Sequence, residues 1–317
     1  MKRNIFNLLK LLLLFVILLL MIAYSNELIS IVIKSIAIWK NNIFTTLFPF
    51  FIISDLLIQY GFIDIIGELT KNITKRFFSL PGESSFVIIS SILTGFPSSS
   101  KYIKSLLEEK TINTEEAQYL LSFTHFPNPI FITGIVGNLL SKEISILILI
   151  SIYLGNLVLA LLFRRKKKLK KERINLSKSF QLINQKNNKN NLIKVLSNSI
   201  YKAIDVLVLI LGIITIFFIL SLLINKVFSF NETINSIISG LLEITQGIKK
   251  VALLNIPIHF KATIITSFIS FGGLSIHIQT KSILDNPDIS YRDYFAKRIL
   301  HSIISGVIIY SLCILNA

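Results

Sequence analysis

Apolar runs long enough to cross a lipid bilayer constrain this chain more than any other feature of its sequence. Hydrophobic residues make up 52% of its 317 residues and charged residues only 16%, against roughly a quarter in soluble domains. The runs are continuous rather than alternating, which predicts helices rather than barrel strands. We therefore expect an all-α, multi-pass protein of the cell membrane. The runs are Ile5–Tyr24, Asn42–Tyr60, Ser84–Ser99, Ser122–Leu140, Ile144–Phe163, Ala203–Ile224, Ile234–Ile256, Ala262–Ile276 and Ile299–Leu315.

The positive charge of the chain is concentrated in one stretch. Residues 164–202 contain 13 Lys or Arg and one acid, so they carry +12 of the formal net charge of +16. The stretch is also rich in Asn and Gln, which is typical of a solvated loop. The positive-inside rule places such a loop in the cytoplasm. We favour this interpretation, with weak contact to the lipid surface, over nucleic-acid binding.

The loop divides the chain into parts. Ile5–Tyr24 resembles a signal peptide, but no small-x-small cleavage site follows it, so we expect an uncleaved helix. Asn42–Tyr60 should run inward because Lys71, Lys75 and Arg76 follow it, and Ala203–Ile224 should then run outward. Leu28–Trp39 is short and either lies at the interface or extends a neighbouring segment. The expected parts are an N-terminal transmembrane helix (1–27), a first repeat (28–163), the basic cytoplasmic loop (164–202) and a second repeat (203–317).

Four apolar runs contain Gly, Pro, Ser or ionisable residues that ordinary spanning helices avoid. Irregular backbone at membrane depth is tolerated only where protein or a water-filled cavity satisfies its polar groups. We therefore predict re-entrant hairpins or broken helices that line a cavity. The four sequences are TGFPSSSK from Thr94, FTHFPNPIF from Phe123, LLEITQG from Leu241 and FGGLSIHIQTK from Phe271.

Two of these breaks suggest an internal repeat. Gly95-Phe96-Pro97-Ser98 can be aligned with Gly272-Gly273-Leu274-Ser275 at an offset of 177 residues, and Lys104 then falls on Lys281. With the halves in opposite orientations, this predicts two inverted repeats. Inverted repeats with broken segments are typical of secondary transporters that bind their substrate near the middle of the membrane.

The first two breaks offer polar groups for a ligand. A helix that starts near Ser98 would present free N–H groups and hydroxyls to an anion or polar ligand, and Lys101 could add a positive charge; the alternative is a capped surface loop. Asn128, between two prolines, suits a ligand or coupling ion, or else caps the next helix. We regard His125 as a hydrogen-bonded residue rather than a proton sensor. The predicted substrate-binding residues here are Gly95, Pro97, Ser98, Ser99, Ser100, Lys101 and Asn128.

The other two breaks add an ionisable residue and a second polar helix start. Glu243 lies within an apolar run, which marks it as a candidate site for a coupling ion or proton, together with Gln246 and Asn128. The alternative is an ion pair with a neighbouring lysine. In the last break we predict substrate binding by Gly272, Gly273, Ser275, His277 and Gln279; the alternative is a glycine-packed helix contact. His301 is expected at the membrane interface.

Sequence patterns for catalysis are missing. The single Cys excludes an internal disulfide, and there is no metal-spaced His/Cys set, P-loop or G-x-S-x-G motif. We expect no enzyme activity, no catalytic residues, no cofactor and no bound metal.

The broken segments together resemble a known family. TGFPSSSKYIKSLLEEKTINTEEAQYLLSFTHFPNPIFITGIVG, LLEITQG and SFGGLSIHIQTKSIL, followed by RDYFAKRILHSI, are similar to the sporulation integral membrane protein family called YlbJ or SpoVV. In TGFPSSSK a Gly or Ala would be expected among the serines. The resemblance implies a nucleoside-recognition gate domain, related in fold to concentrative nucleoside transporters, and a role in endospore formation.

The resemblance also implies a substrate. It suggests movement of dipicolinate, a small aromatic dicarboxylate, from the mother cell across the outer forespore membrane, with Phe96 or Phe271 stacked on its ring. The expected partners are this small anionic substrate, the lipid bilayer and an unidentified coupling ion, with no nucleic acid. The alternatives are a transporter of nucleosides or other small polar metabolites, and a sporulation membrane scaffold that transports nothing.

Overall fold

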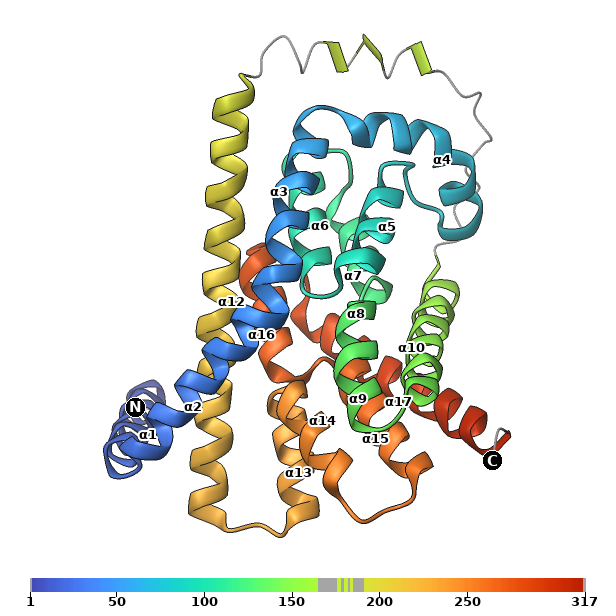
Figure 1. The fold of residues 1–317 in the computed structure, drawn as a ribbon. Helices are drawn as coiled ribbons and strands as arrows, with labels where there is room; N and C mark the ends of the chain where they lie inside the picture. Colours follow the sequence, from blue (N-terminus) through green and yellow to red (C-terminus); the bar gives the residue numbers. More distant parts are fainter. Residues whose placement is uncertain (1, 165–175, 178–179, 182, 185–190, 316–317) are drawn as a thin grey trace.

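The computed structural model describes residues 2–164, 176–177, 180–181, 183–184 and 191–315 (Figure 1). Most of the basic stretch 164–202 therefore lies outside the described residues. The regular elements within the described ranges are all helical, and six of them, some interrupted, are long and apolar enough to cross a membrane. The structure confirms the predicted all-α, multi-pass architecture.

The elements follow one another with short connections. They are α1 (Lys2–Ala23), α2 (Ser25–Ile38), the π-helix η1 (Trp39–Phe44), α3 (Thr45–Gln59), α4 (Phe62–Phe78), α5 (Ser84–Thr94), α6 (Ser98–Glu108), α7 (Thr114–Phe123), α8 (Pro129–Phe131), the π-helix η2 (Ile132–Val136), α9 (Gly137–Leu139), α10 (Lys142–Leu162), α12 (Leu192–Phe228), α13 (Glu232–Leu242), α14 (Ile244–Leu253), α15 (Ile258–Phe271), α16 (Gly273–Leu284) and α17 (Tyr291–Leu315).

Helix α12 defines the long axis of the bundle. It has 37 residues and is about 55 Å long, more than the roughly 30 Å of hydrocarbon in a bilayer. We call the end of the bundle where α10 ends and α12 begins the loop end. The opposite end of the bundle is the far end. Helix α3 packs against α12 and runs toward the loop end, whereas α12 runs away from it (Figure 1). Helix α12 begins at Leu192, within the range expected to be loop, because the Asn191 side chain caps it.

The broken segments form two kinds of structure. Helices α5 and α6 pack together as a hairpin that enters from the loop end, and α13 and α14 form a hairpin that enters from the far end (Figure 1). The longest of these four helices has 11 residues, about 16 Å, so each hairpin reaches only about halfway through the bilayer. The segments α7–α9 and α15–α16 instead continue across the bundle after their breaks.

The two halves have the same order of parts in opposite directions. Each half contains a long helix (α3 or α12), a hairpin, a broken crossing helix and a final helix (α10 or α17). The alignment of Gly95 with Gly272 was nevertheless wrong, because Gly95 lies at a hairpin tip and Gly272 in a crossing helix. The hairpin tips that correspond are those at Gly95 and Glu243. Glycine marks both kinds of break, so composition could not distinguish them.

The final helices α10 and α17 pack against each other and against the broken crossing helices. Their inner faces contribute Ile148, Ile152 and Ile309 to a buried apolar cluster that also contains Cys313. In contrast, α1 lies at the side of the bundle, and its apolar side chains from Ile5 onward are mostly exposed, for example Leu11 at 64% (Figure 1). Side chains of this kind are suited to contact with lipid.

Candidate functional site

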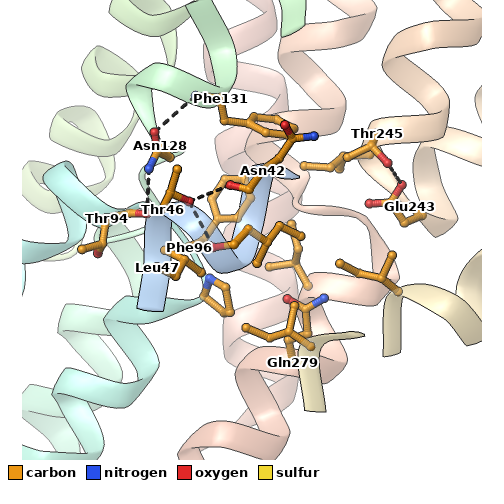
Figure 2. A pocket seen from close by; sticks show the side chains of 16 residues that line it. Asn42, Thr46, Leu47, Thr94, Phe96, Asn128, Phe131, Glu243, Thr245 and Gln279 are labelled. Atoms are coloured by element: carbon orange, nitrogen blue, oxygen red, sulfur yellow. Dashed lines mark hydrogen bonds between the residues drawn. The ribbon is translucent and has the colours of Figure 1, made fainter. Parts of the chain in front are cut away.

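A cavity of about 70 Å³ lies where the broken segments meet (Figure 2). Its lining draws on both hairpin tips, both broken crossing helices, and the long helices α3 and α12. Thr94 and Asn128 lie on one side and Glu243 and Thr245 on the other (Figure 2). The complete lining is Asn42, Ile43, Thr46, Leu47, Thr94, Phe96, Pro97, Asn128, Phe131, Ile210, Ile214, Glu243, Ile244, Thr245, Ile276 and Gln279.

The tip of the first hairpin is fastened to the break after α7. Gly95 has φ +79°, and a Cβ atom there would lie 2.4 Å from the backbone N of Asn128. This close approach allows Phe96 N–H to donate to the carbonyl of Phe126 at 2.7 Å. The Asn128 Nδ2 donates to the carbonyl of Thr94 at 3.3 Å. The two breaks of the first repeat therefore form one wall of the cavity.

Asn128 is both a helix cap and a lining residue. Its Oδ1 accepts hydrogen bonds from the N–H groups of Ile130 at 2.8 Å and Phe131 at 3.2 Å. The cap that the sequence offered as an alternative is thus present. The Oδ1 and Nδ2 atoms of Asn128 both have hydrogen-bond partners within the protein, so a ligand at Asn128 has to share these atoms with those partners.

Glu243 forms the tip of the second hairpin. It is in an extended conformation between α13 and α14 and is only 2% exposed. Its Oε2 accepts from the N–H of Gln246 at 3.1 Å and from the Thr245 hydroxyl. A carboxylate is favoured at this helix N-terminus by the helix dipole. Within the described ranges, no Lys or Arg lies within ion-pair distance of Glu243.

Two of the three lysines that follow Glu243 in sequence bind elsewhere. Lys250 Nζ donates to Asn235 Oδ1 at 2.6 Å and to Ser239 Oγ at 2.7 Å, which joins α13 to α14. Lys261 Nζ donates to the carbonyl of Ala252 at 2.8 Å. The carboxyl group of Glu243 lines the cavity and forms no ion pair with Lys249, Lys250, Lys261 or any other described basic residue.

The last break contributes Gln279 but not its other predicted residues. Gly272 has φ +96°, and a Cβ there would lie 2.9 Å from Cε1 of His125, so the two crossing breaks touch. His277 faces away from the cavity, with Nε2 2.9 Å from the carbonyl of Phe271 and Nδ1 3.3 Å from the Tyr291 hydroxyl. Ser275 is buried, and its hydroxyl has no hydrogen-bond partner among the residues that the structure describes.

The serines and the lysine of the first break are turned toward the protein. Ser98 is hydrogen-bonded to Thr94 and to the carbonyl of Gly95. Lys101 Nζ donates to the carbonyl of Phe51 in α3 at 3.3 Å and lies 4.4 Å from the centre of its ring. The predicted residues that line the cavity are Pro97, Asn128, Glu243 and Gln279; those outside its lining are Gly95, Ser98, Ser99, Ser100, Lys101, Gln246, Gly272, Gly273, Ser275 and His277.

The prediction for His301 was wrong. Its ring is completely buried, with Nε2 3.1 Å from the carbonyl of Ile152 and Nδ1 3.1 Å from the carbonyl of Ser270. The basic residue three positions earlier, Arg298, is buried beside it and does not face an interface. His301 lies near the start of the apolar run Ile299–Leu315, and such a position looks interfacial in sequence. Helix α17 begins earlier, at Tyr291, and has buried side chains on both sides of His301.

Four polar lining residues were missed by the sequence analysis. They are Asn42, Thr46, Thr94 and Thr245, the first two from the start of the α3 segment. The sequence signal was the polar group within WKNNIFTT, where the structure has a π-helix from Trp39 to Phe44. π-helical turns inside α-helices occur frequently at functional sites.

The chemistry of the cavity follows from this lining. Amides and hydroxyls provide hydrogen bonds, and Glu243 is the one ionisable residue in the lining. Phe96 and Phe131 supply aromatic surface, and none of the described basic side chains lines the cavity. The cavity therefore offers hydrogen-bonding groups and flat apolar surface side by side.

The fold and this cavity define a multi-pass membrane protein built from inverted repeats with a site at the meeting point of its broken helices. The family described as Gate, nucleoside recognition, matches residues 42–137, which include the first hairpin and the first crossing break.

The chain is also similar to the sporulation integral membrane protein YlbJ of Bacillus subtilis (strain 168). The two are 27% identical over 304 residues, which cover 86% of this chain and 74% of the relative. No solved structure matches the chain. The two matches confirm the resemblance to the YlbJ family that the sequence motifs indicated.

Proposed function

We propose that this protein is a transporter that moves a small, planar, polar solute across a membrane during sporulation. The observation that supports this is the lining of the cavity, which combines both hairpin tips and both crossing breaks. Because these elements belong to two inverted repeats, rocking of one repeat against the other would open the cavity to one side and then the other.

Dipicolinate is our first candidate for the solute, moved from the mother cell across the outer forespore membrane. Similarity to a sporulation membrane protein favours a solute that spores accumulate. The rings of Phe96 and Phe131 can contact the aromatic ring, and the N-termini of half-helices favour its carboxylates. Since Glu243 also lies in the cavity, binding of a dianion requires that Glu243 be protonated or hold a cation.

This requirement leads to a coupling proposal. We assign the coupling ion or proton to Glu243, with Asn128 and Gln246 as supporting polar groups. The proposal accounts for a carboxyl group that is 2% exposed and has no basic partner among the described residues. A charge held at this depth without compensation is costly, so an exchangeable cation or proton is the simplest source of compensation.

A nucleoside is the second candidate, and a specific observation favours it. The polar lining is mainly neutral amides and hydroxyls, and its described residues include no basic side chain to pair with a carboxylate. Such a lining suits a neutral solute with many hydrogen-bonding groups. The description of the matching family, nucleoside recognition, also favours a nucleoside as the solute.

Spore chemistry tests the proposal. A deletion strain would be complemented with the wild-type gene or with Asn128→Ala, Glu243→Ala or Gln279→Ala, and dipicolinate would be measured separately in spores and mother cells. Leu154→Ala, on the exposed face of α10, is the control. We expect the three cavity variants to leave dipicolinate in the mother cell. Normal spore content in all three, at normal protein levels, would remove the site assignment.

Vesicle uptake separates the candidates. Purified protein in liposomes would be given radiolabelled dipicolinate or radiolabelled nucleosides, and the same cavity variants would be compared. Uptake of dipicolinate alone supports the first candidate, and uptake of nucleosides alone the second. A membrane scaffold would transport neither, and its sporulation function would survive the cavity changes but not changes to its surface.

A further inference from the structure

A buried arginine lies behind the cavity, outside its lining. Arg298, in α17, is 0% exposed and is the largest fully buried side chain of the described part of the chain. None of the described Asp or Glu side chains lies within ion-pair distance of it. A guanidinium remains charged in proteins, so its burial in a membrane requires compensation from other groups.

The compensation comes from the ends of two half-helices. One terminal nitrogen of Arg298, Nη2, donates to the carbonyl of Ser122, and the other, Nη1, lies 3.0 Å from Nδ1 of His301. The same His301 nitrogen is 3.1 Å from the carbonyl of Ser270. Ser122 is in the last turn of α7, and Ser270 is in the last turn of α15.

These two helix ends belong to different repeats and approach each other from opposite ends of the bundle (Figure 1). The C-terminal end of a helix has unsatisfied carbonyls and about half a negative charge. Two such ends facing each other at membrane depth repel, unless a positive charge lies between them. Arg298 supplies that charge to α7 through a direct hydrogen bond, and to α15 through space, because its guanidinium and the Ser270 carbonyl both lie against the same nitrogen of His301.

The neighbouring contacts extend this arrangement to the rest of the site. His301 Nε2 lies 3.1 Å from the carbonyl of Ile152 in α10, so both final helices take part. His125 lies next to His301, with ring centres 6.3 Å apart, and stacks on the cavity residue Phe96 at 4.4 Å. The ends of the half-helices are thus connected to the cavity wall through packed rings.

We propose that the Arg298 guanidinium is a built-in cation that neutralises the facing C-termini of α7 and α15 and so holds the two repeats in register behind the cavity. Arg298 is a positioning residue, because it does not touch the cavity. The inference goes beyond the proposed function and does not depend on which solute is bound.

Chemical rescue tests the charge directly. Arg298→Ala removes the guanidinium and leaves a space of its size between the two helix ends. Free guanidinium ion, added at millimolar concentration, has the shape and charge of the lost group, and urea has the same planar shape without the charge. The melting temperature of the purified full chain in detergent would be measured with guanidinium chloride, urea or sodium chloride at equal concentration. Arg292→Ala, an exposed arginine of the same helix, is the matched control.

We expect Arg298→Ala to melt at a lower temperature than Arg292→Ala. Guanidinium should restore at least half of the loss, urea should restore none of it, and the control variant should respond to neither. Melting like the control, or equal effects of guanidinium and urea, would overturn the proposal. Loss of transport together with guanidinium rescue of melting would leave this inference intact, whatever becomes of the proposed solute.

If Arg298→Ala does not fold, a second pair of variants tests the same proposal. Arg298→Lys keeps the charge, and Arg298→Gln keeps hydrogen-bond donation without it. If charge is the essential property, the lysine variant melts at the higher temperature of the two. The opposite order would refute the role of Arg298 as a counter-charge.

Discussion

Gly95→Ala is the substitution with the most direct structural consequence. The backbone of Gly95 has φ +79° and ψ 175°, a region that is essentially restricted to glycine and costs about 1–3 kcal/mol for other residues. The added Cβ would also lie 2.4 Å from the backbone N and 2.9 Å from the Cα of Asn128. Because both are backbone atoms, no side-chain rotation relieves the overlap.

The hairpin tip must therefore separate from the break after α7. Separation weakens the hydrogen bond from Phe96 N–H to Phe126 and the one from Asn128 to Thr94, each worth about 1 kcal/mol. With the backbone strain, we expect Gly95→Ala to lower the free energy of unfolding by about 3–5 kcal/mol. The same separation would widen the cavity and reduce transport.

Equilibrium unfolding of the purified protein in mixed micelles measures this loss. Gly212→Ala is the matched control, because a Cβ at Gly212, inside α12, has nothing within 4 Å. Alanine is favoured over glycine in a helix by about 1 kcal/mol, so the control should be as stable as the wild type or slightly more stable. A Gly95→Ala protein within 1 kcal/mol of the wild type, with unchanged transport, would refute the assigned packing of the tip.

Three further substitutions separate stability from function. Glu243→Gln keeps an acceptor for the cap of α14, so we expect normal melting but uptake into vesicles that no longer responds to a proton or sodium gradient; a full response would exclude Glu243 as the coupling residue. Asp55→Ala removes the buried carboxylate that accepts hydrogen bonds from Ser199 at 2.7 Å and Gln59 at 2.5 Å. It should lower the unfolding free energy by about 2–4 kcal/mol, whereas an unchanged value would contradict this role. Asn113→Ala removes the capping box of α7 and should cost about 1 kcal/mol with normal uptake, and a loss of uptake would instead place this cap in the transport mechanism.

The sequence predicted the breaks well because a break is a local property. Gly, Pro and polar residues inside an apolar run interrupt a helix wherever the run is located in the fold. Pro97, Asn128, Glu243 and Gln279 line the cavity, and each was identified as a polar or irregular position in such a run. The opposite orientation of the halves also followed from local charge, since the positive-inside rule needs only a count of lysines and arginines.

The direction in which a side chain points could not be predicted in the same way. Lys101 follows the first break by one helical turn, but its amine faces Phe51 of α3 rather than the cavity. His301 and Arg298 are near the start of the last helix, and only the packing of α17 against α10 and α15 makes them buried. These outcomes depend on the rotation of a helix about its axis, which is decided by contacts between segments far apart in sequence.

The burial of Cys313 has a practical consequence for locating the two sides of the molecule. It is the single thiol of the sequence and is 8% exposed within the apolar cluster of α17. A cysteine introduced at an exposed position would therefore be the main one to react with a membrane-impermeant maleimide. At Lys110, between α6 and α7, it should be labelled from the cytoplasm, and at Ser229, between α12 and α13, from the opposite side. No native cysteine would first have to be removed.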